Sequence, residues 1–149
     1  MKSFFDNSTL QEFTQRLDKL SPNAPAQWGK MNVSQMLAHC NAAMEVALGD
    51  IKPKRSFLGL VIGKLAKPML TNDVPFKPNM PTDKGFIITG SRDFEKERQK
   101  LVGLITRFSK GGASTMERRV HPFFGLMTPE EWSTSQVKHL DHHFRQFGA

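Results

Sequence analysis

Four segments of the chain place apolar residues at the spacing of an amphipathic helix, and they cover residues 8–20, 32–48, 91–112 and 128–146. Three of these segments open with a capping box, in which an N-cap residue and the Gln or Glu three positions later bind each other's backbone: Ser8 with Gln11, Asn32 with Gln35, and Thr128 with Glu131. The remaining segment opens at Ser91 with acidic residues in its first turn, which also favours a helix start. The pattern therefore predicts four principal helices.

The region between the second and third predicted helices has a different character. Residues 55–70 are apolar enough for a short helix, which we expect Pro68 to end. Residues 72–86 are rich in proline and turn-forming residues, and the stretch GFIIT at 85–89 is expected to be briefly extended. Because strand patterns are otherwise almost absent, we predict an all-α four-helix bundle with an extra short helix and a long Pro-rich loop between helices 2 and 3.

Apolar residues lie all round the predicted helix at 55–70 rather than on one side. This distribution predicts burial in the domain or in a dimer interface, rather than adsorption to a membrane surface. We therefore do not expect a membrane partner.

Length and composition are those of one globular domain spanning residues 1–149, with 38% hydrophobic and 23% charged residues. No signal peptide is recognised, and a single cysteine, Cys40, excludes an intramolecular disulfide. Together these features predict a cytoplasmic protein.

The net charge of +7 raises nucleic acid as a partner. The basic residues are scattered, however, with no tract of five or more, and tyrosine is absent. Nucleic acid is therefore not the expected partner.

Three of the five histidines lie close together in the last predicted helix. The core face of that helix is defined by its apolar residues, Trp132, Val137, Leu140, Phe144 and Phe147. At roughly 100° per residue, His143 falls within this face and His139 just beyond its edge, whereas His142 is expected to point into solvent. His139 and His143 thus form an H-x-x-x-H pair that can place two nitrogens on one metal ion.

His39 lies at the margin of the apolar face of the second helix. Opposite the H-x-x-x-H pair, it would complete a three-histidine metal site of His39, His139 and His143. The alternative interpretation is that water or backbone carbonyls satisfy these imidazoles. Gln146, one turn after His143, is placed to orient the ligands rather than to bind the metal. We place His121, in the segment before the last helix, at the mouth of the pocket; it could equally pack against its neighbours Pro122 and Phe123.

Two blocks of the sequence resemble an uncharacterised subfamily of the DinB/YfiT-like superfamily of metalloenzymes: W-G-K-M-N-V-S-Q-M-L-A-H-C at 28–40, and H-P-F-F-G at 121–125 with H-L-D-H-H-F-R-Q-F-G at 139–148. The resemblance covers nearly the whole chain. It implies a bundle in up-down-down-up order, a divalent metal held by three histidines with an open coordination position, and homodimers. Characterised relatives are transferases and isomerases that use a low-molecular-weight thiol.

Two functions of different class are compatible with such a site. The first is a metal-dependent enzyme, in which a divalent ion such as Zn or Ni activates a low-molecular-weight thiol or a water toward a small-molecule substrate. Lys77, Lys84 and Arg145 could hold an acidic thiol. Relatives commonly end H-R-G-Q where this chain has Phe144 and Arg145 before the Gln, so the identity of the thiol is not carried over. The alternative is a non-catalytic metal-binding or stress-associated bundle, which a fourth protein ligand would favour.

Overall fold

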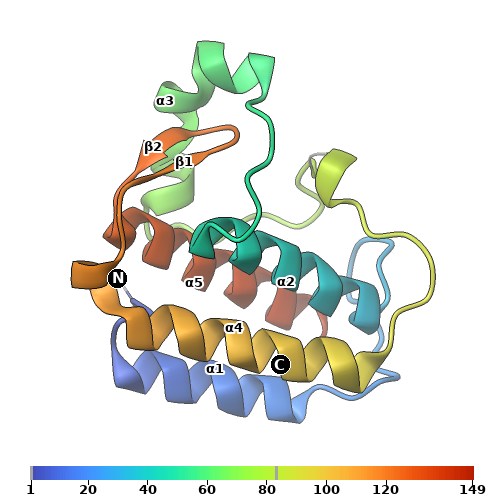
Figure 1. The fold of residues 1–149 in the computed structure, drawn as a ribbon. Helices are drawn as coiled ribbons and strands as arrows, with labels where there is room; N and C mark the ends of the chain where they lie inside the picture. The colour runs from blue at the N-terminus through green and yellow to red at the C-terminus, as the bar shows by residue number, and fades with distance from the viewer. Residues whose placement is uncertain (1, 83) are drawn as a thin grey trace.

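The computed structural model describes residues 2–82 and 84–149. Within these residues the chain is mostly helical with a small two-stranded sheet (Figure 1). In chain order the elements are α1 (Asn7–Lys19), α2 (Val33–Leu48), α3 (Phe57–Thr71), the 3-10 helix η1 (Lys84–Phe86), α4 (Phe94–Thr115), β1 (Arg119–His121), β2 (Gly125–Met127) and α5 (Pro129–Gln146).

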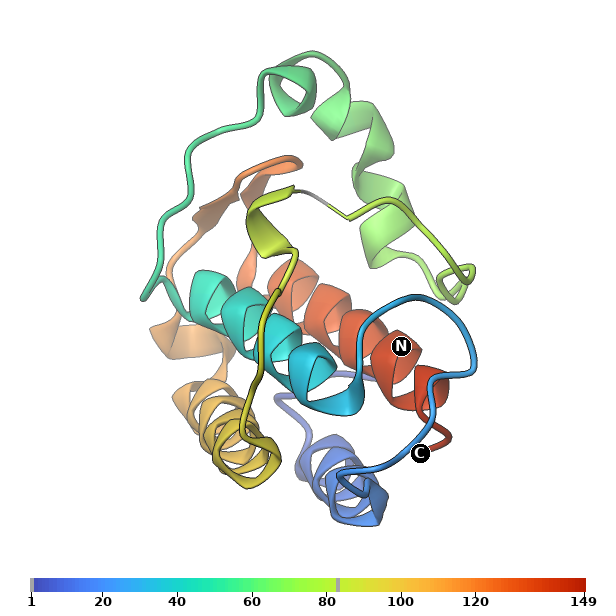
Figure 2. The ribbon, with the colours of Figure 1, turned by 90° about the vertical axis from the view of Figure 1, so that its right-hand side faces the viewer.

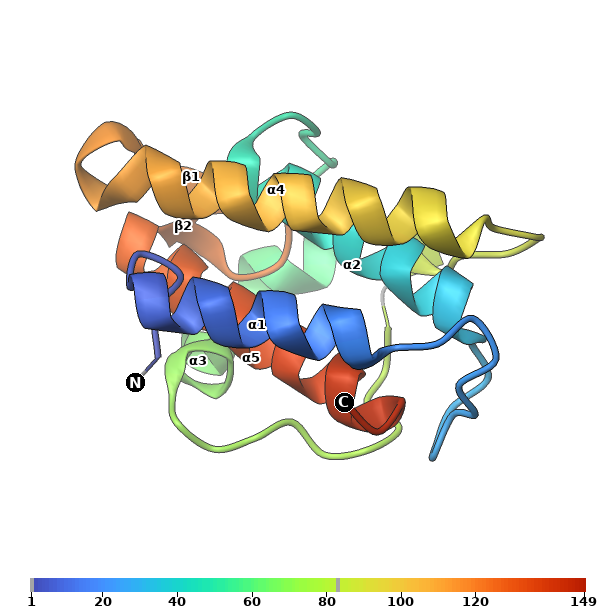
Figure 3. The ribbon, with the colours of Figure 1, turned by 90° about the horizontal axis from the view of Figure 1, so that it is seen from below.

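One hydrophobic core lies between α1, α2, α4 and α5. Each of these helices contributes fully buried side chains, among them Leu17, Leu37, Leu101 and Leu140. Seen from below, α1 runs beside α4, and α2 and α5 lie behind them (Figure 3). The four helices predicted from the apolar periodicity are therefore the ones that form this core.

The predicted helix starts are confirmed where both halves of a capping box form. Asn32 and Gln35 make both hydrogen bonds at the start of α2, and Thr128 and Glu131 do the same at the start of α5. The box predicted at Ser8 is wrong, because the N-cap of α1 is Asp6, two residues earlier, and Ser8 lies inside the helix. The start predicted at Ser91 also lies too early: the Asp93 carboxylate accepts from the Lys96 amide and caps α4. The predicted break at Gly112 is confirmed: its φ of 65° and ψ of 163° are non-helical, and a short helical stretch follows it to the end of α4 at Thr115.

The sequence pattern did not reveal the β-hairpin. β1 and β2 pair antiparallel with Arg119 opposite Met127 and His121 opposite Gly125. Each strand has three residues, which is too short to produce a recognisable alternation. The extended stretch expected at 85–89 is also wrong, because its first two residues belong to η1.

Helix α3 differs from expectation in both its length and its burial. It continues through Pro68 to Thr71, and the Lys138 ammonium binds the carbonyls of Met69 and Asn72 at its end. Of the two places predicted for its apolar side chains, the interior of the domain is wrong, since Phe57 is 81% exposed, and a dimer interface stays a prediction. No helix in residues 2–82 or 84–149 combines the length and the apolar character needed to cross a membrane.

Two glycines allow α3 to pack against the hairpin turn. Gly59 and Gly63 are buried one turn apart, and a Cβ atom at either position would collide with the carbonyl oxygen of Phe123. The backbone of the turn therefore occupies the space that a side chain would need.

Gly63→Ala is expected to lower the free energy of unfolding by about 1–3 kcal/mol, because it overpacks a backbone contact that cannot yield. Gly103→Ala, in an exposed position of α4 with open space around it, is the matched control and should raise that free energy by about 0.5–1 kcal/mol. Urea unfolding of the two variants checks the prediction. Equal stability of both variants would contradict the contact.

Candidate metal centre

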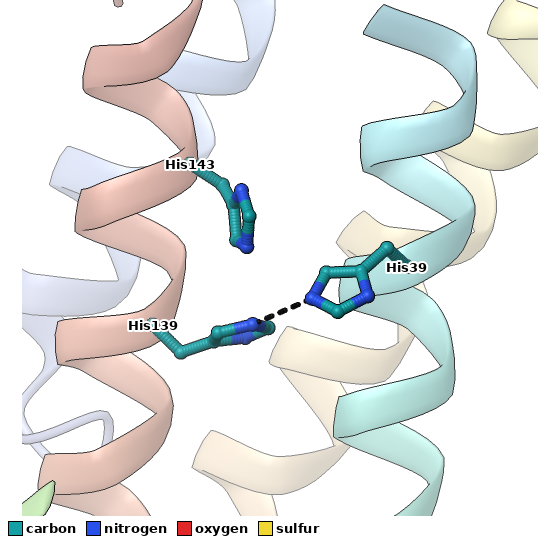
Figure 4. A group of neighbouring side chains, drawn as sticks. All are labelled: His39, His139 and His143. Carbon is teal, nitrogen blue, oxygen red and sulfur yellow. Dashed lines mark hydrogen bonds between the residues drawn. The ribbon is translucent and has the colours of Figure 1, made fainter. Parts of the chain in front are cut away.

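Three histidines from two helices meet between α2 and α5 (Figure 4). His39 comes from α2, and His139 and His143 come from successive turns of α5. One ring nitrogen of each lies within 4.8 Å of those of the other two. His39 and His143 are buried, and His139 is partly exposed. The three imidazoles could hold a metal ion.

His39 is oriented by a backbone carbonyl from the long loop. Its Nδ1 lies 2.9 Å from the carbonyl oxygen of Phe86, in η1. Because a carbonyl only accepts, Nδ1 carries the proton and donates it. The lone pair of His39 is therefore on Nε2, the atom that faces the other two histidines (Figure 4). Figure 2 shows η1 lying over α2, where it can make this contact.

A chain of two hydrogen bonds orients His143. The Gln146 amide nitrogen donates to the carbonyl of Trp28 at 2.6 Å, which leaves its Oε1 to accept from His143 Nδ1 at 2.9 Å. The Trp28 carbonyl thereby decides which way the amide of Gln146 points, and Gln146 decides which nitrogen of His143 carries the proton. The Nε2 of His143 is left with its lone pair available.

His139 completes the cluster without an orienting partner of its own. Its Nε2 lies 2.9 Å from His39 Nε2, and its Nδ1 is buried with no hydrogen-bond partner among the described residues. Since His39 keeps its proton on Nδ1, the proton between the two Nε2 atoms comes from His139. A cation in place of that proton would accept all three Nε2 lone pairs, so the donor set fits a divalent metal.

Burial holds all three imidazoles in the neutral form that metal ligation needs. Desolvation, followed by the neighbouring His39, lowers the pKa of His143 to about 3, although its hydrogen bond to Gln146 opposes this shift. Desolvation also lowers the pKa of His39, partly offset by its hydrogen bond to Phe86. The pKa of His139 is well below its ordinary value through desolvation and the adjacent His143 and His39.

His142 is not a surface residue, contrary to the prediction from the helix geometry. It is 8% exposed, and its ring lies 5.4 Å from that of Trp28 and 6.0 Å from that of Phe76. The side of α5 opposite the core is covered by two loops, which a single helix cannot reveal. Desolvation lowers the pKa of His142, and a hydrogen bond to the backbone of Phe76 opposes that shift. His142 does not belong to the three-histidine cluster.

His121 lies at the end of β1 and has a local structural role. Its Nδ1 accepts hydrogen bonds from the amides of Phe123 and Phe124 at 3.1 and 3.2 Å, so it closes the hairpin turn. Its ring packs against Trp132, with 5.2 Å between centroids. Desolvation, followed by the nearby Arg55, lowers its pKa to about 4.

This lowered pKa predicts a loss of stability in acid. Unfolded His121 takes up a proton below pH ~6.5, whereas folded His121 does so only near pH 4, so its contribution is complete above pH 6.5 and lost as the pH falls toward 4. His121→Asn keeps an acceptor but does not titrate. The variant should gain about 3 kcal/mol relative to the parent between pH 7 and 4 in urea unfolding with a chelator present. A stability difference that is constant with pH would contradict this.

The nearest acids and the thiol stay outside the cluster. Glu45 pairs with Lys100 at 2.8 Å, and Asp141 pairs with Arg16 and Arg145 at 2.8 and 2.9 Å. Cys40 is fully buried in the core, and burial raises the pKa of its thiol. As expected from their helix faces, neither acid is placed as a general base, and Cys40 behaves as a small hydrophobic residue.

Three supporting residues were not found from the sequence. Trp28 and Phe86 act through backbone carbonyls, which carry no side-chain signal. Gly29 has a φ of 82°, and a Cβ atom there would lie 2.7 Å from the Gln146 amide nitrogen. Gly29 itself was the available signal, since glycine is the usual residue where the backbone has a positive φ or another group approaches it closely.

The chain belongs to DUF1569, a family described as proteins of unknown function, whose model matches residues 3–149. Neither the curated proteins nor the solved structures include a significant match to it.

Proposed function

We propose that this protein is a metal-dependent enzyme whose divalent ion is held by His39, His139 and His143. The observation that carries the proposal is the convergence of three neutral imidazoles, two of which have their Nδ1 protons committed to other acceptors. Bound there, a divalent ion such as Zn or Ni would keep its full charge and an open coordination position, and would lower the pKa of a bound thiol or water.

The number of histidines in the cluster favours a catalytic metal over a purely structural one. Structural zinc sites have four protein ligands, whereas catalytic sites have three and leave a position open. The histidine cluster identified in the described residues has three members. A non-catalytic, stress-associated metal-binding bundle is the competing proposal, and it would require a fourth ligand from the chain.

A hollow that shares Phe86 with the site, and that none of the three histidines lines, suggests the class of substrate. It has a volume of about 330 Å³ and lies between α2, the segment after it, η1 and the hairpin turn, with a lining that includes Ala42, Val46, Ile51, Lys54, Phe86 and Pro122. Phe86 links the hollow to the histidine cluster, because it lines the hollow and its carbonyl orients His39. The mostly apolar lining with one lysine suits a small molecule with an apolar body and an acidic group.

The thiol-transfer reaction rests on the resemblance to the DinB/YfiT-like superfamily, as does the up-down-down-up bundle. Two exposed lysines support an acidic thiol: Lys84 is in η1, two residues before Phe86, and Lys77 follows Phe76, which contacts His142. Arg145 is less suited, because its guanidinium pairs with Asp141.

Elemental analysis of protein purified without a nickel column and supplemented with divalent metals tests the proposal. We expect about one ion per chain after dialysis. Addition of a small thiol to Co²⁺-loaded protein should then change its visible spectrum, because the open position accepts the sulfur. Stoichiometry near zero would overturn the metal site, and a spectrum insensitive to thiol would favour the structural alternative.

A further inference from the structure

Helix α3 presents an apolar face that no other part of the described chain covers. Its first turns project away from the four long helices (Figure 1), whereas the helix contacts α5 and, through Gly59 and Gly63, the hairpin. Phe57 and Leu65 are 81% and 84% exposed. Two adjacent exposed leucine and valine side chains, Leu60 and Val61, extend the same surface. Apolar patches of this kind mark contact with a partner or a lipid surface.

The outward face is wide and almost uniformly apolar. With roughly 100° between successive residues, the arc opposite the two glycines covers about 200° of the helix. Within it lie Leu60, Thr71, Lys64, Phe57, Pro68, Val61, Leu65, Leu58, Met69 and Ile62. Helix α3, whose sequence is apolar all round, thus has one buried side with the two glycines and one exposed apolar side.

The charge on this segment is mostly positive. Residues 51–72 contain Lys52, Lys54, Arg55, Lys64 and Lys67 and no acidic residue, with Asp50 and Asp73 at its two ends. Lys67 pairs with Glu131, whereas no ion pair to a described residue is found for the other four. Exposed apolar side chains flanked by unpaired cations are typical of helices that lie in the interface of an anionic bilayer.

A second copy of the chain is a poorer occupant of this face. Lys64 is the central residue of α3 and points outward, so a twofold axis through the middle of the helix would bring two lysines together. The flanking cations of both copies would add to this repulsion. An anionic surface has the complementary charge.

We propose that α3 is a docking element that lies in the plane of an anionic lipid bilayer, with its apolar face in the interface. At 15 residues, α3 is about 22 Å long, which suits an in-plane helix. The expectation of no membrane partner rested on burial of this face in the domain or in a dimer interface; its exposure in the chain removes the first basis, and the central Lys64 argues against the second.

Co-sedimentation of the full chain with vesicles tests this proposal. The vesicles contain either phosphatidylcholine alone or equal parts of phosphatidylcholine and phosphatidylglycerol. We expect binding to the anionic vesicles at least about tenfold stronger than to the neutral ones, and weakened by salt. Absence of binding to the anionic vesicles would overturn the proposal.

Two sets of variants separate α3 from a general effect of charge or hydrophobicity. Phe57→Ser with Leu65→Ser should lower binding at least about tenfold, whereas Met80→Ser with Ile87→Ser, also exposed but outside α3, should not. Far-UV circular dichroism should be unchanged, since these side chains make no core contact.

Charge is tested in the same way. Replacing Lys52, Lys54 and Lys64 by Gln should weaken binding, while the same change at the exposed lysines Lys19, Lys96 and Lys110 should have little effect. Equal weakening by both sets would overturn the assignment to α3. So would a dimer, seen by sedimentation velocity, that the Phe57→Ser and Leu65→Ser pair dissociates, because a second copy would then cover the face.

Discussion

Each of the three clustered histidines is expected to be indispensable for metal binding. His39→Ala, His139→Ala and His143→Ala should each lower metal affinity by more than about 100-fold, because a site with two remaining imidazoles loses a direct ligand rather than an orienting group. Metal per chain after dialysis, measured by elemental analysis, is the readout. Circular dichroism confirms that each variant is folded.

His142→Ala is the matched control for these variants. His142 is buried and adjacent to His143 in the chain, with 5.0 Å between the ring centroids, yet it lies outside the cluster. The variant should lose some stability with its aromatic contacts and still bind metal. Loss of metal in His142→Ala together with retention in His139→Ala would show that the ligand assignment is wrong.

Metal affinity should hold in moderately acid solution. Because burial lowers the pKa of His143 to about 3 and those of the other two below their ordinary value, protons compete with the metal only at lower pH. Between pH 6.5 and 5.5 we expect less than a tenfold loss of affinity. Three histidines of ordinary pKa would lose roughly a hundredfold over that interval, and titration of metal at the two pH values distinguishes the outcomes.

Gln146→Ala is expected to lower metal affinity by about 10–100-fold without removing the site. Gln146 donates to the Trp28 carbonyl and accepts from His143, and these two hydrogen bonds hold the His143 ring in place. Without Gln146 the His143 ring is free to rotate and to change tautomer. The effect should therefore appear in affinity, with the stoichiometry at saturating metal unchanged.

Gln136→Ala is the control for this effect. Gln136 is on the same helix and is 5% exposed against 3% for Gln146, so both variants remove a buried amide of equal size. Gln136 has no described hydrogen bond to a clustered histidine. An equal loss of affinity in the two variants would contradict the orienting role of Gln146.

The helices could be predicted because local sequence determines them. The capping boxes at Asn32 and Thr128 form between residues three positions apart, and His139 and His143 lie one helical turn apart. Both features depend only on nearby residues. The same local geometry placed His39 at the margin of its helix, and the structure brings it to the other two.

What the sequence could not show depends on contacts between distant segments. His142 was assigned to the surface because a helix taken alone has no information about the loops that cover it; Trp28 is more than 100 positions away in the chain. The exposure of Phe57 was missed for a similar reason: the packing of α3 is decided by the backbone of the hairpin turn, which has no sequence signature.

The bond between His39 and His139 joins residues that are 100 positions apart. An ion shared by these two side chains would close a loop of that length, and such a link restricts the unfolded chain far more than the folded one. By analogy with a disulfide across about 100 residues, the entropic contribution is of the order of 4–5 kcal/mol wherever the ion stays bound during unfolding. Metal loading would then act on the dimensions of the denatured ensemble as well as on the site, and small-angle scattering in denaturant would record a more compact chain.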